Sequence, residues 1–154
     1  MRILIAAVGR ARAGPERDLF EVYRGRLHWP VAVKEVEERR PLATAERVAR
    51  EGALLLAALP KRGDVAVVAL DERGASLSSG ELAKKMGAWR DRGVAELAFL
   101  IGGADGHGAA VRERADLVLS LGAMTWPHLL VRAMLAEQLY RAQQILAGHP
   151  YHRG

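Results

Sequence analysis

The chain has 154 residues, the length of a single domain, and half of its residues are hydrophobic while 27% are charged. It contains no cysteine, which excludes disulfides, thiolate metal sites and a cysteine nucleophile. No apolar run approaches the ~18 residues of a membrane-spanning helix. We therefore expect a cytoplasmic protein without a membrane partner. The formal net charge of +5 suits a polyanionic partner such as RNA, and equally suits an ordinary basic protein.

The first third of the chain alternates between strand and helix patterns. Arg2–Val8 is an apolar run that predicts a buried strand, and a helix is expected from Pro15 to about Leu27. Val31–Val36 places polar residues between valines, which predicts a strand near the edge of a sheet. Thr44 is expected to cap a helix over Ala45–Leu59.

The same alternation continues to the C-terminus. Val65–Leu70 predicts a fully buried strand followed by a turn at Asp71–Gly74, and Ser78 or Ser79 is expected to cap a helix that ends near Arg92. The remaining expected elements are strands at Leu97–Ile101 and Leu117–Leu121 and helices at His107–Ala115 and Thr125–Ala147, before the tail HPYHRG. Strands that alternate with helices predict one α/β domain over residues 1–154, a parallel sheet with helices on both faces.

Three of the expected strands run into glycine-bearing turns, at Leu70–Gly74, Ile101–Gly106 and Leu121–Pro127. Because ligands bind beyond the carboxyl ends of parallel strands, these turns predict a pocket lined by backbone that suits adenine or another flat heterocycle. Glycine is also common in plain strand–helix turns, so that simpler interpretation stays open. The fingerprints of dinucleotide dehydrogenases, P-loop NTPases and serine hydrolases are absent from the sequence.

Two further features of the last third bear on function. His149 and His152 have a spacing that suits a metal, but Pro150 separates them and no carboxylate is near, so we expect no metal site. The expected helix 125–147 carries apolar residues on several sides, which indicates burial on several sides. It either packs on both the sheet and a second subunit, or is the central helix of a monomer.

The C-terminal third carries a specific set of motifs. The stretch LIGGADG at 100–106 and the stretch LSLGAMTWPHLLVRAMLAEQLYRAQQILAGHPYHRG at 119–154 closely resemble the RlmH family, which are small SPOUT-class methyltransferases that modify ribosomal RNA. The opening strand and the LDERG turn at 70–74 also fit, so the resemblance covers nearly the whole chain. Trp126 stands where many relatives carry leucine, and Ala104 where many carry proline.

This resemblance implies a SPOUT fold with a C-terminal trefoil knot that binds S-adenosylmethionine. It implies a homodimer that acts on 23S rRNA within the 70S ribosome, where it methylates N3 of a pseudouridine. The residues that the resemblance assigns to the cofactor are Leu70, Gly102, Gly103, Leu121, Gly122, Ala123, Met124, Thr125, Trp126 and Pro127.

The candidate catalytic residues lie in the same C-terminal motif. An arginine is suited to stabilise the negative charge that develops on the base, and a histidine is suited to take its proton. We expect the tail 151–153 to reach into the pocket of the partner subunit. Two alternatives stay open: a SPOUT methyltransferase with another RNA specificity, and a non-catalytic ribosome-binding factor. The candidates are His128, Arg132, Tyr151, His152 and Arg153.

Overall fold

A computed structural model describes residues 1–153 and shows five strands and five α-helices, with a short 3-10 helix near the end. The strands are β1 (Arg2–Val8), β2 (Val31–Val36), β3 (Val65–Ser76), β4 (Glu96–Ile101) and β5 (Leu117–Ser120). The helices are α1 (Pro15–Arg24), α2 (Thr44–Ala57), α3 (Ser79–Asp91), α4 (Ala109–Arg114), α5 (His128–Leu146) and the 3-10 helix η1 (Pro150–His152).

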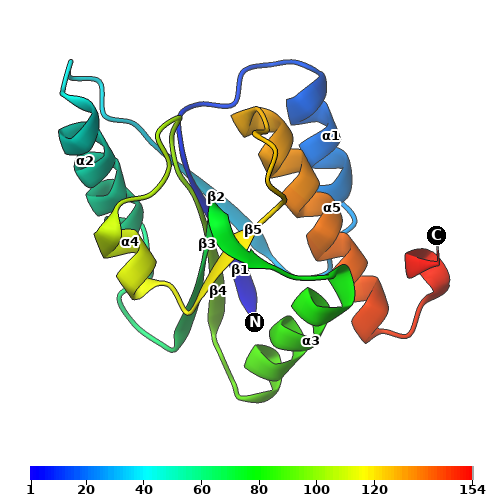
Figure 1. The fold of residues 1–154 in the computed structure, drawn as a ribbon. Coiled ribbons are helices and arrows are strands. Elements are labelled where there is room, and N and C mark those ends of the chain that lie inside the picture. Colours follow the sequence, from blue (N-terminus) through cyan, green and yellow to red (C-terminus); the bar gives the residue numbers. More distant parts are fainter. Residues whose placement is uncertain (154) are drawn as a thin grey trace.

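All five strands are parallel and lie in the order β2-β1-β4-β3-β5. Helices α1, α3 and α5 cover one face of this sheet, and α2 and α4 cover the other (Figure 1). The predicted fold class is therefore confirmed. Alternate residues of each central strand enter two separate apolar cores: Ile3 and Ile5 of β1 face α5, whereas Leu4 and Ala6 face α2.

The edge position of β2 follows from its sequence. Its burial alternates between intermediate and exposed, whereas β1 and β4 are almost wholly buried. A strand that alternates in this way has only one apolar side to pack, so it belongs at an edge, as predicted.

Helix ends follow local chemistry. Ser78 caps α3 with a capping box: its side chain accepts from the Glu81 backbone N–H, and the Glu81 carboxylate accepts from the Ser78 backbone N–H. The predicted cap at Thr44 is wrong, because Thr44 is the first residue of α2 and Ala43 precedes it without a side-chain cap. Helix α5 begins three residues later than predicted, because Pro127 at its N-cap is extended.

Strand β3 is longer than predicted, and the expected turn at Asp71–Gly74 is an irregular part of the strand. β3 pairs with β5 both before and after this irregularity, through Leu70 and again through Ala75. Gly74 lies so close to β5 that a Cβ on it would sit 2.6 Å from the carbonyl carbon of Val118. The end of β3 therefore wraps tightly against β5.

The many-sided apolar character of α5 has its explanation inside the chain. The helix packs on the sheet and is flanked by α1 and α3 (Figure 1), and its buried residues include Leu135 and Leu139. The burial of α5 is thus satisfied largely within one chain, and it does not require a second subunit. No helix within residues 1–153 is long and apolar enough to cross a membrane.

Candidate active site

The three glycine-bearing turns meet at the carboxyl edge of the sheet and form one pocket of about 770 Å³. Leu70 and the residues after it supply one side, the turn after β4 supplies the second, and the segment between β5 and α5 supplies the third. The volume lies within the range typical of small-molecule sites. Of the ten predicted cofactor residues, all except Ala123 line this pocket: Leu70, Gly102, Gly103, Leu121, Gly122, Met124, Thr125, Trp126 and Pro127.

The segment between β5 and α5 forms the open rim of the pocket. Met124 is 73% exposed and Trp126 is 38% exposed, which is unusual for large apolar side chains. The Trp126 indole Nε1–H donates to the Leu121 carbonyl at 3.3 Å, which folds the rim over its own backbone. Gly122 has a φ of 115°, a conformation that favours glycine, so the tight exit from β5 depends on it.

A charged pair holds the other side of the pocket. The buried carboxylate of Asp71 accepts from the backbone N–H of Arg73 at 2.9 Å and from its guanidinium at 3.1 Å. Burial raises the pKa of Asp71, but the hydrogen bonds from Arg73 outweigh it, so the pKa lies below its usual value. The sequence suggested only a backbone turn here; the Asp-x-Arg spacing in LDERG is the signal that was missed.

His107 is a buried side chain that packs beneath the turn after β4. Its Nε2 lies 3.1 Å from the Leu100 carbonyl, which makes Nε2–H the donor in the neutral ring. A Cβ on Gly102 would meet the His107 ring at 3.1 Å, so the glycine and the histidine fit each other. Burial lowers the pKa of His107 below its usual value, because the protonated ring is poorly solvated there.

This buried histidine predicts an acid-sensitive fold. As the pH falls, His107 is protonated in the unfolded chain before it is protonated in the folded one. The contribution of the neutral ring to the free energy of unfolding is therefore complete above pH 6.5 and declines below that value. The stability difference between wild type and His107→Gln should shrink between pH 7.5 and pH 5, by at most about 1.4 kcal/mol per pH unit. Urea denaturation at several pH values measures it, and a constant difference would contradict the assignment.

The candidate catalytic residues divide into two groups. His128 lines the pocket at the first residue of α5. Arg132, one turn further along, is absent from that lining: its Nη1 donates to Glu35 at 2.6 Å and its Nη2 donates to the Gly9 carbonyl at 3.0 Å. The structure therefore ties Arg132 to the ends of β1 and β2.

The tail packs on the far end of α5 within its own chain. The Tyr151 hydroxyl donates to Glu137 at 3.3 Å, and His152 Nδ1 lies 3.2 Å from Arg141. Burial raises the pKa of Tyr151 to about 12. Glu137 lies nine residues beyond His128, roughly 14 Å along the helix axis, and the tail side chains are absent from the lining of the pocket of their own chain. Arg153 is exposed, and Gly154 lies outside the described residues.

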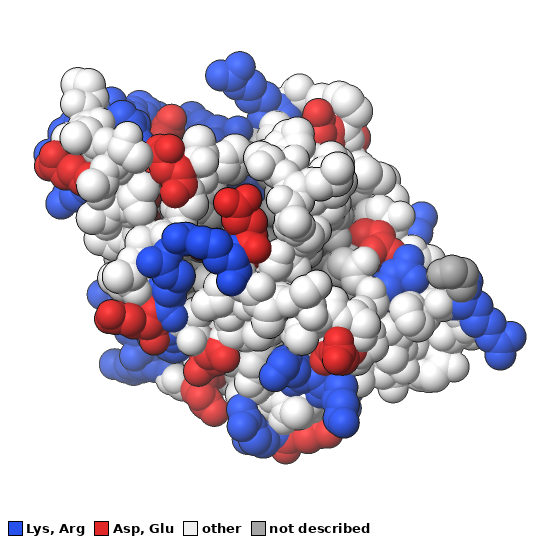
Figure 2. Space-filling model, in the orientation of Figure 1, with Lys and Arg blue, Asp and Glu red and all other residues white. Residues whose placement is uncertain are grey.

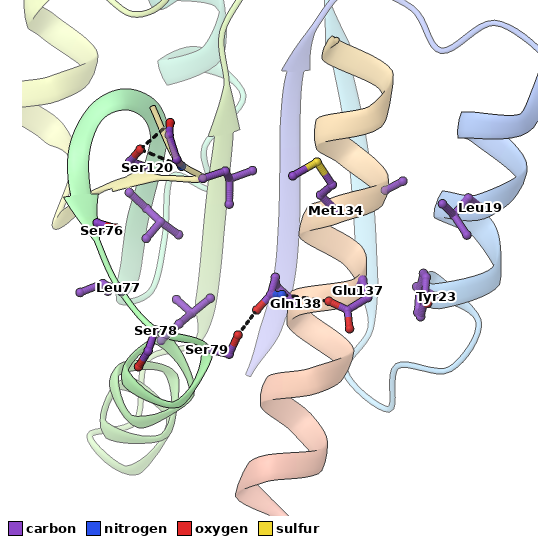
Figure 3. Close-up of a pocket in the computed structure, with 15 residues that line it drawn as sticks. Leu19, Tyr23, Ser76, Leu77, Ser78, Ser79, Ser120, Met134, Glu137 and Gln138 are labelled. Carbon is purple, nitrogen blue, oxygen red and sulfur yellow. Dashed lines mark hydrogen bonds between the residues drawn. The ribbon is translucent and has the colours of Figure 1, made fainter. Parts of the chain in front are cut away.

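A second cavity, of about 490 Å³, opens on the face that carries α1, α3 and α5. Figure 3 shows Leu19 and Tyr23 of α1 across from the segment Ser76–Ser79, with α5 between them. The Ser79 hydroxyl donates to Gln138 at 2.6 Å across this cavity. It shares Leu119, Leu121 and Gly122 with the first pocket, and most of its other lining comes from α1, α3 and α5, so it lies beside the strand-end site.

Charge is unevenly spread over this side of the molecule. Figure 2 shows an uncharged region just to the right of the centre of the face, with an acidic and a basic side chain next to it and charged side chains of both signs around the outline. Within residues 1–153 no three His, Asp or Glu side chains come together as a possible metal site.

Comparison with known proteins agrees with this architecture. The family model described as "Predicted SPOUT methyltransferase" matches residues 1–152. A protein of Paramagnetospirillum magneticum named "Ribosomal RNA large subunit methyltransferase H" is 63% identical over 153 residues, which cover 99% of each chain. A protein of Rhodospirillum centenum with the same name is 62% identical, again over 99% of each chain.

The fold is also similar to a solved structure. A probable methylase family protein from Haemophilus influenzae matches with a TM-score of 0.57 at 10% identity, over 99% of this chain and 70% of that chain. At this identity the likeness bears on fold alone. The full-length family match and the relatives above 60% identity carry the assignment: the chain belongs to the SPOUT methyltransferase family.

Proposed function

We propose that this protein methylates large-subunit ribosomal RNA, with S-adenosylmethionine as the donor and N3 of a 23S pseudouridine as the acceptor. The family and the names of its near relatives support the rRNA part. The observation that carries the enzymatic part is the strand-end pocket, which combines nine of the ten residues assigned to the cofactor. The choice of pseudouridine as the target nucleoside and of N3 as the methylated atom comes from the family resemblance.

The chemistry of the pocket fits this cofactor. Apolar walls at Leu70, Leu121 and Val131 suit the adenine ring, and the glycines let backbone groups approach it. Asp71 and Asp105 line the same pocket and suit the positive charges of the ligand. When bound, the sulfonium supplies an electrophilic methyl group.

The protein must orient the base and help its imide proton leave, since the N3–H of pseudouridine is mostly protonated at neutral pH. His128 stands at the pocket and at the first turn of α5, where the helix dipole favours negative charge. Positioning and electrostatic stabilisation of this kind supply most of the rate in such a transfer.

We also propose that the active unit is a homodimer in which the tail of one subunit completes the site of the other, in a fold with a C-terminal trefoil knot. The knot rests on the family resemblance, and the close approach of Gly74 to the backbone of β5 shows how tightly the chain packs in that region. Four large apolar side chains with substantial exposure support a dimer surface near α1 and the pocket rim. They are Leu19, Val22, Met124 and Trp126.

The RNA surface of one small domain is limited, so recognition is proposed to depend on the shape of the assembled ribosome. We propose that Arg10, Arg12, Arg24, Arg26 and the C-terminal arginines touch phosphates. Arg10 and Arg12 are exposed, and Arg10 also lies 3.7 Å from Glu37. Arg24 donates to the Val31 carbonyl at 2.8 Å, and Arg26 lies over the Tyr23 ring at 5.3 Å, so both are engaged within the chain.

Methyl transfer to intact ribosomes tests this function. With labelled S-adenosylmethionine, 70S particles from a strain that lacks this modification should be methylated, and a naked rRNA stem-loop should react about 10²-fold more slowly because its target base is poorly positioned. Mass spectrometry of the labelled nucleoside identifies the atom. Equal turnover on the stem-loop would contradict the dependence on assembly, and a labelled ribose or tRNA would contradict the specificity.

A further inference from the structure

Two buried polar atoms have no hydrogen-bond partner within residues 1–153: the Oε1 oxygen of Glu51 and the Nε of Arg132. Buried polar groups are almost always paired, because leaving one unpaired is costly. Both residues line one cavity of about 440 Å³. One atom is an acceptor and the other is a donor, so together they suit a group that offers one donor and one acceptor.

This cavity adjoins the cofactor pocket. The two share Gly103, Ala104, Asp105 and His128, so the turn after β4 and the start of α5 form a common wall. The cavity is bounded on its other side by α2, which carries Glu51, and by the end of β1. A molecule held there would lie next to whatever the first pocket holds.

We propose that this second cavity receives the target base, with Glu51 accepting the imide N–H and Arg132 Nε–H donating to a carbonyl beside it. The edge of a uracil-type base presents this N–H between two carbonyls, which complements one acceptor and one donor. The inference rests on the proposed function, and it assigns the acceptor subsite and a residue, Glu51, that the sequence did not single out.

Glu51 is fixed by its surroundings. It is 8% exposed, and both carboxylate oxygens would lie 2.9 Å from a Cβ placed on residue 103. The glycine at 103 therefore lets the carboxylate lie directly against the wall that separates the two sites. A carboxylate at that position lines the second cavity but does not line the cofactor pocket.

Arg132 is equally fixed. Its two terminal nitrogens are occupied by Glu35 and by the Gly9 carbonyl, and its side chain is only 5% exposed. The remaining Nε–H is thus held in one direction. A guanidinium already paired at its ends is a preorganised donor, and it costs little reorganisation when charge develops on a carbonyl oxygen.

The charges around Glu51 suit a proton acceptor. Burial raises the pKa of its carboxyl, and Asp105 and Glu38 raise it further, while Arg47 and His128 oppose the rise. In the proposed step the N3–H bond breaks, the proton moves to Oε1 of Glu51, and the electron pair stays on the ring nitrogen, which becomes the nucleophile. The proton passes to water after the product leaves.

Three variants test the assignment. Glu51→Gln keeps a carbonyl that accepts the N–H but takes no proton, so kcat on 70S particles should fall about 10²-fold with little change in KM. Glu51→Leu removes the acceptor, so saturation transfer to pseudouridine in NMR should be lost while calorimetric affinity for S-adenosylmethionine is kept. Glu46→Gln, on the exposed side of the same helix, should match wild type in every assay.

Stability separates this role from a structural one. An unpaired buried carboxylate weakens the fold, so both Glu51 variants should melt at or above the wild-type temperature. A lower melting temperature, or full activity of Glu51→Gln, would overturn the inference and leave the proposed function standing. If wild type methylates no rRNA, the proposed function fails, and the pseudouridine signal of wild type against Glu51→Leu alone decides whether the cavity binds the base.

Discussion

Removal of Tyr151–Gly154 is expected to abolish methyl transfer, by about 10³-fold or more, while S-adenosylmethionine still binds. Within its own chain this segment packs on the second half of α5 and does not line the strand-end pocket. We propose that it acts in catalysis by reaching the pocket of another subunit. Activity on 70S particles and calorimetry with the cofactor measure the two effects separately.

A mixing experiment distinguishes action between subunits from a structural role. Chains that lack the tail are co-expressed with chains carrying Gly122→Val, whose φ of 115° and place in the rim make a side chain intolerable for the pocket. Each variant alone should be inactive, and mixed dimers should regain activity because one intact pocket meets one intact tail. Loss of cofactor binding in the truncated chain would show that the tail only supports the fold.

Gly74→Ala is expected to destabilise the protein by about 3 kcal/mol or more. A Cβ at this position would lie 2.6 Å from the carbonyl oxygen of Val118 and 2.8 Å from the Leu119 nitrogen. These are backbone atoms of β5, so they cannot rotate away, and β3 and β5 must separate. Because the displaced segment forms one wall of the pocket, cofactor affinity should fall with stability.

Gly80→Ala is the matched control. Gly80 lies in the first turn of α3, where the nearest atom to a new Cβ is the Ser78 hydroxyl at 3.9 Å. Alanine in a helix should raise stability by roughly 0.5–1 kcal/mol relative to glycine. Urea denaturation compares both variants; a Gly74→Ala chain as stable as wild type would contradict the tight wrap of β3 on β5.

Much of the fold could be predicted because its signals are local. Continuous apolar runs such as Val65–Leu70 can be distinguished from helical patterns in the sequence. The capping box at Ser78 marks the start of α3. The extension of β3 to Ser76 could not be predicted in this way. Its residues are polar or glycine, and they become a strand only because β5 pairs with them from 40 or so residues away.

In the candidate site, too, the features with a local sequence signal could be predicted, and those that depend on contacts between distant segments could not. Glycine after a strand is visible in the sequence, and it led to the pocket that Gly102 and Gly122 line. The engagement of Arg132 with Glu35 joins α5 to the edge strand, and no pattern around either residue indicates it. Glu51 looks like an ordinary polar residue of α2, and only the fold buries its carboxylate against Gly103.

The central claim is that this chain places a methyl group on one pseudouridine of the large-subunit rRNA, and nucleoside analysis of that rRNA tests it most directly. Large-subunit rRNA from a strain lacking the gene should contain no N3-methylpseudouridine, and a plasmid copy of the wild-type gene should restore it. The same amount of N3-methylpseudouridine with and without the gene, or loss of a different methylated nucleoside, would contradict the account.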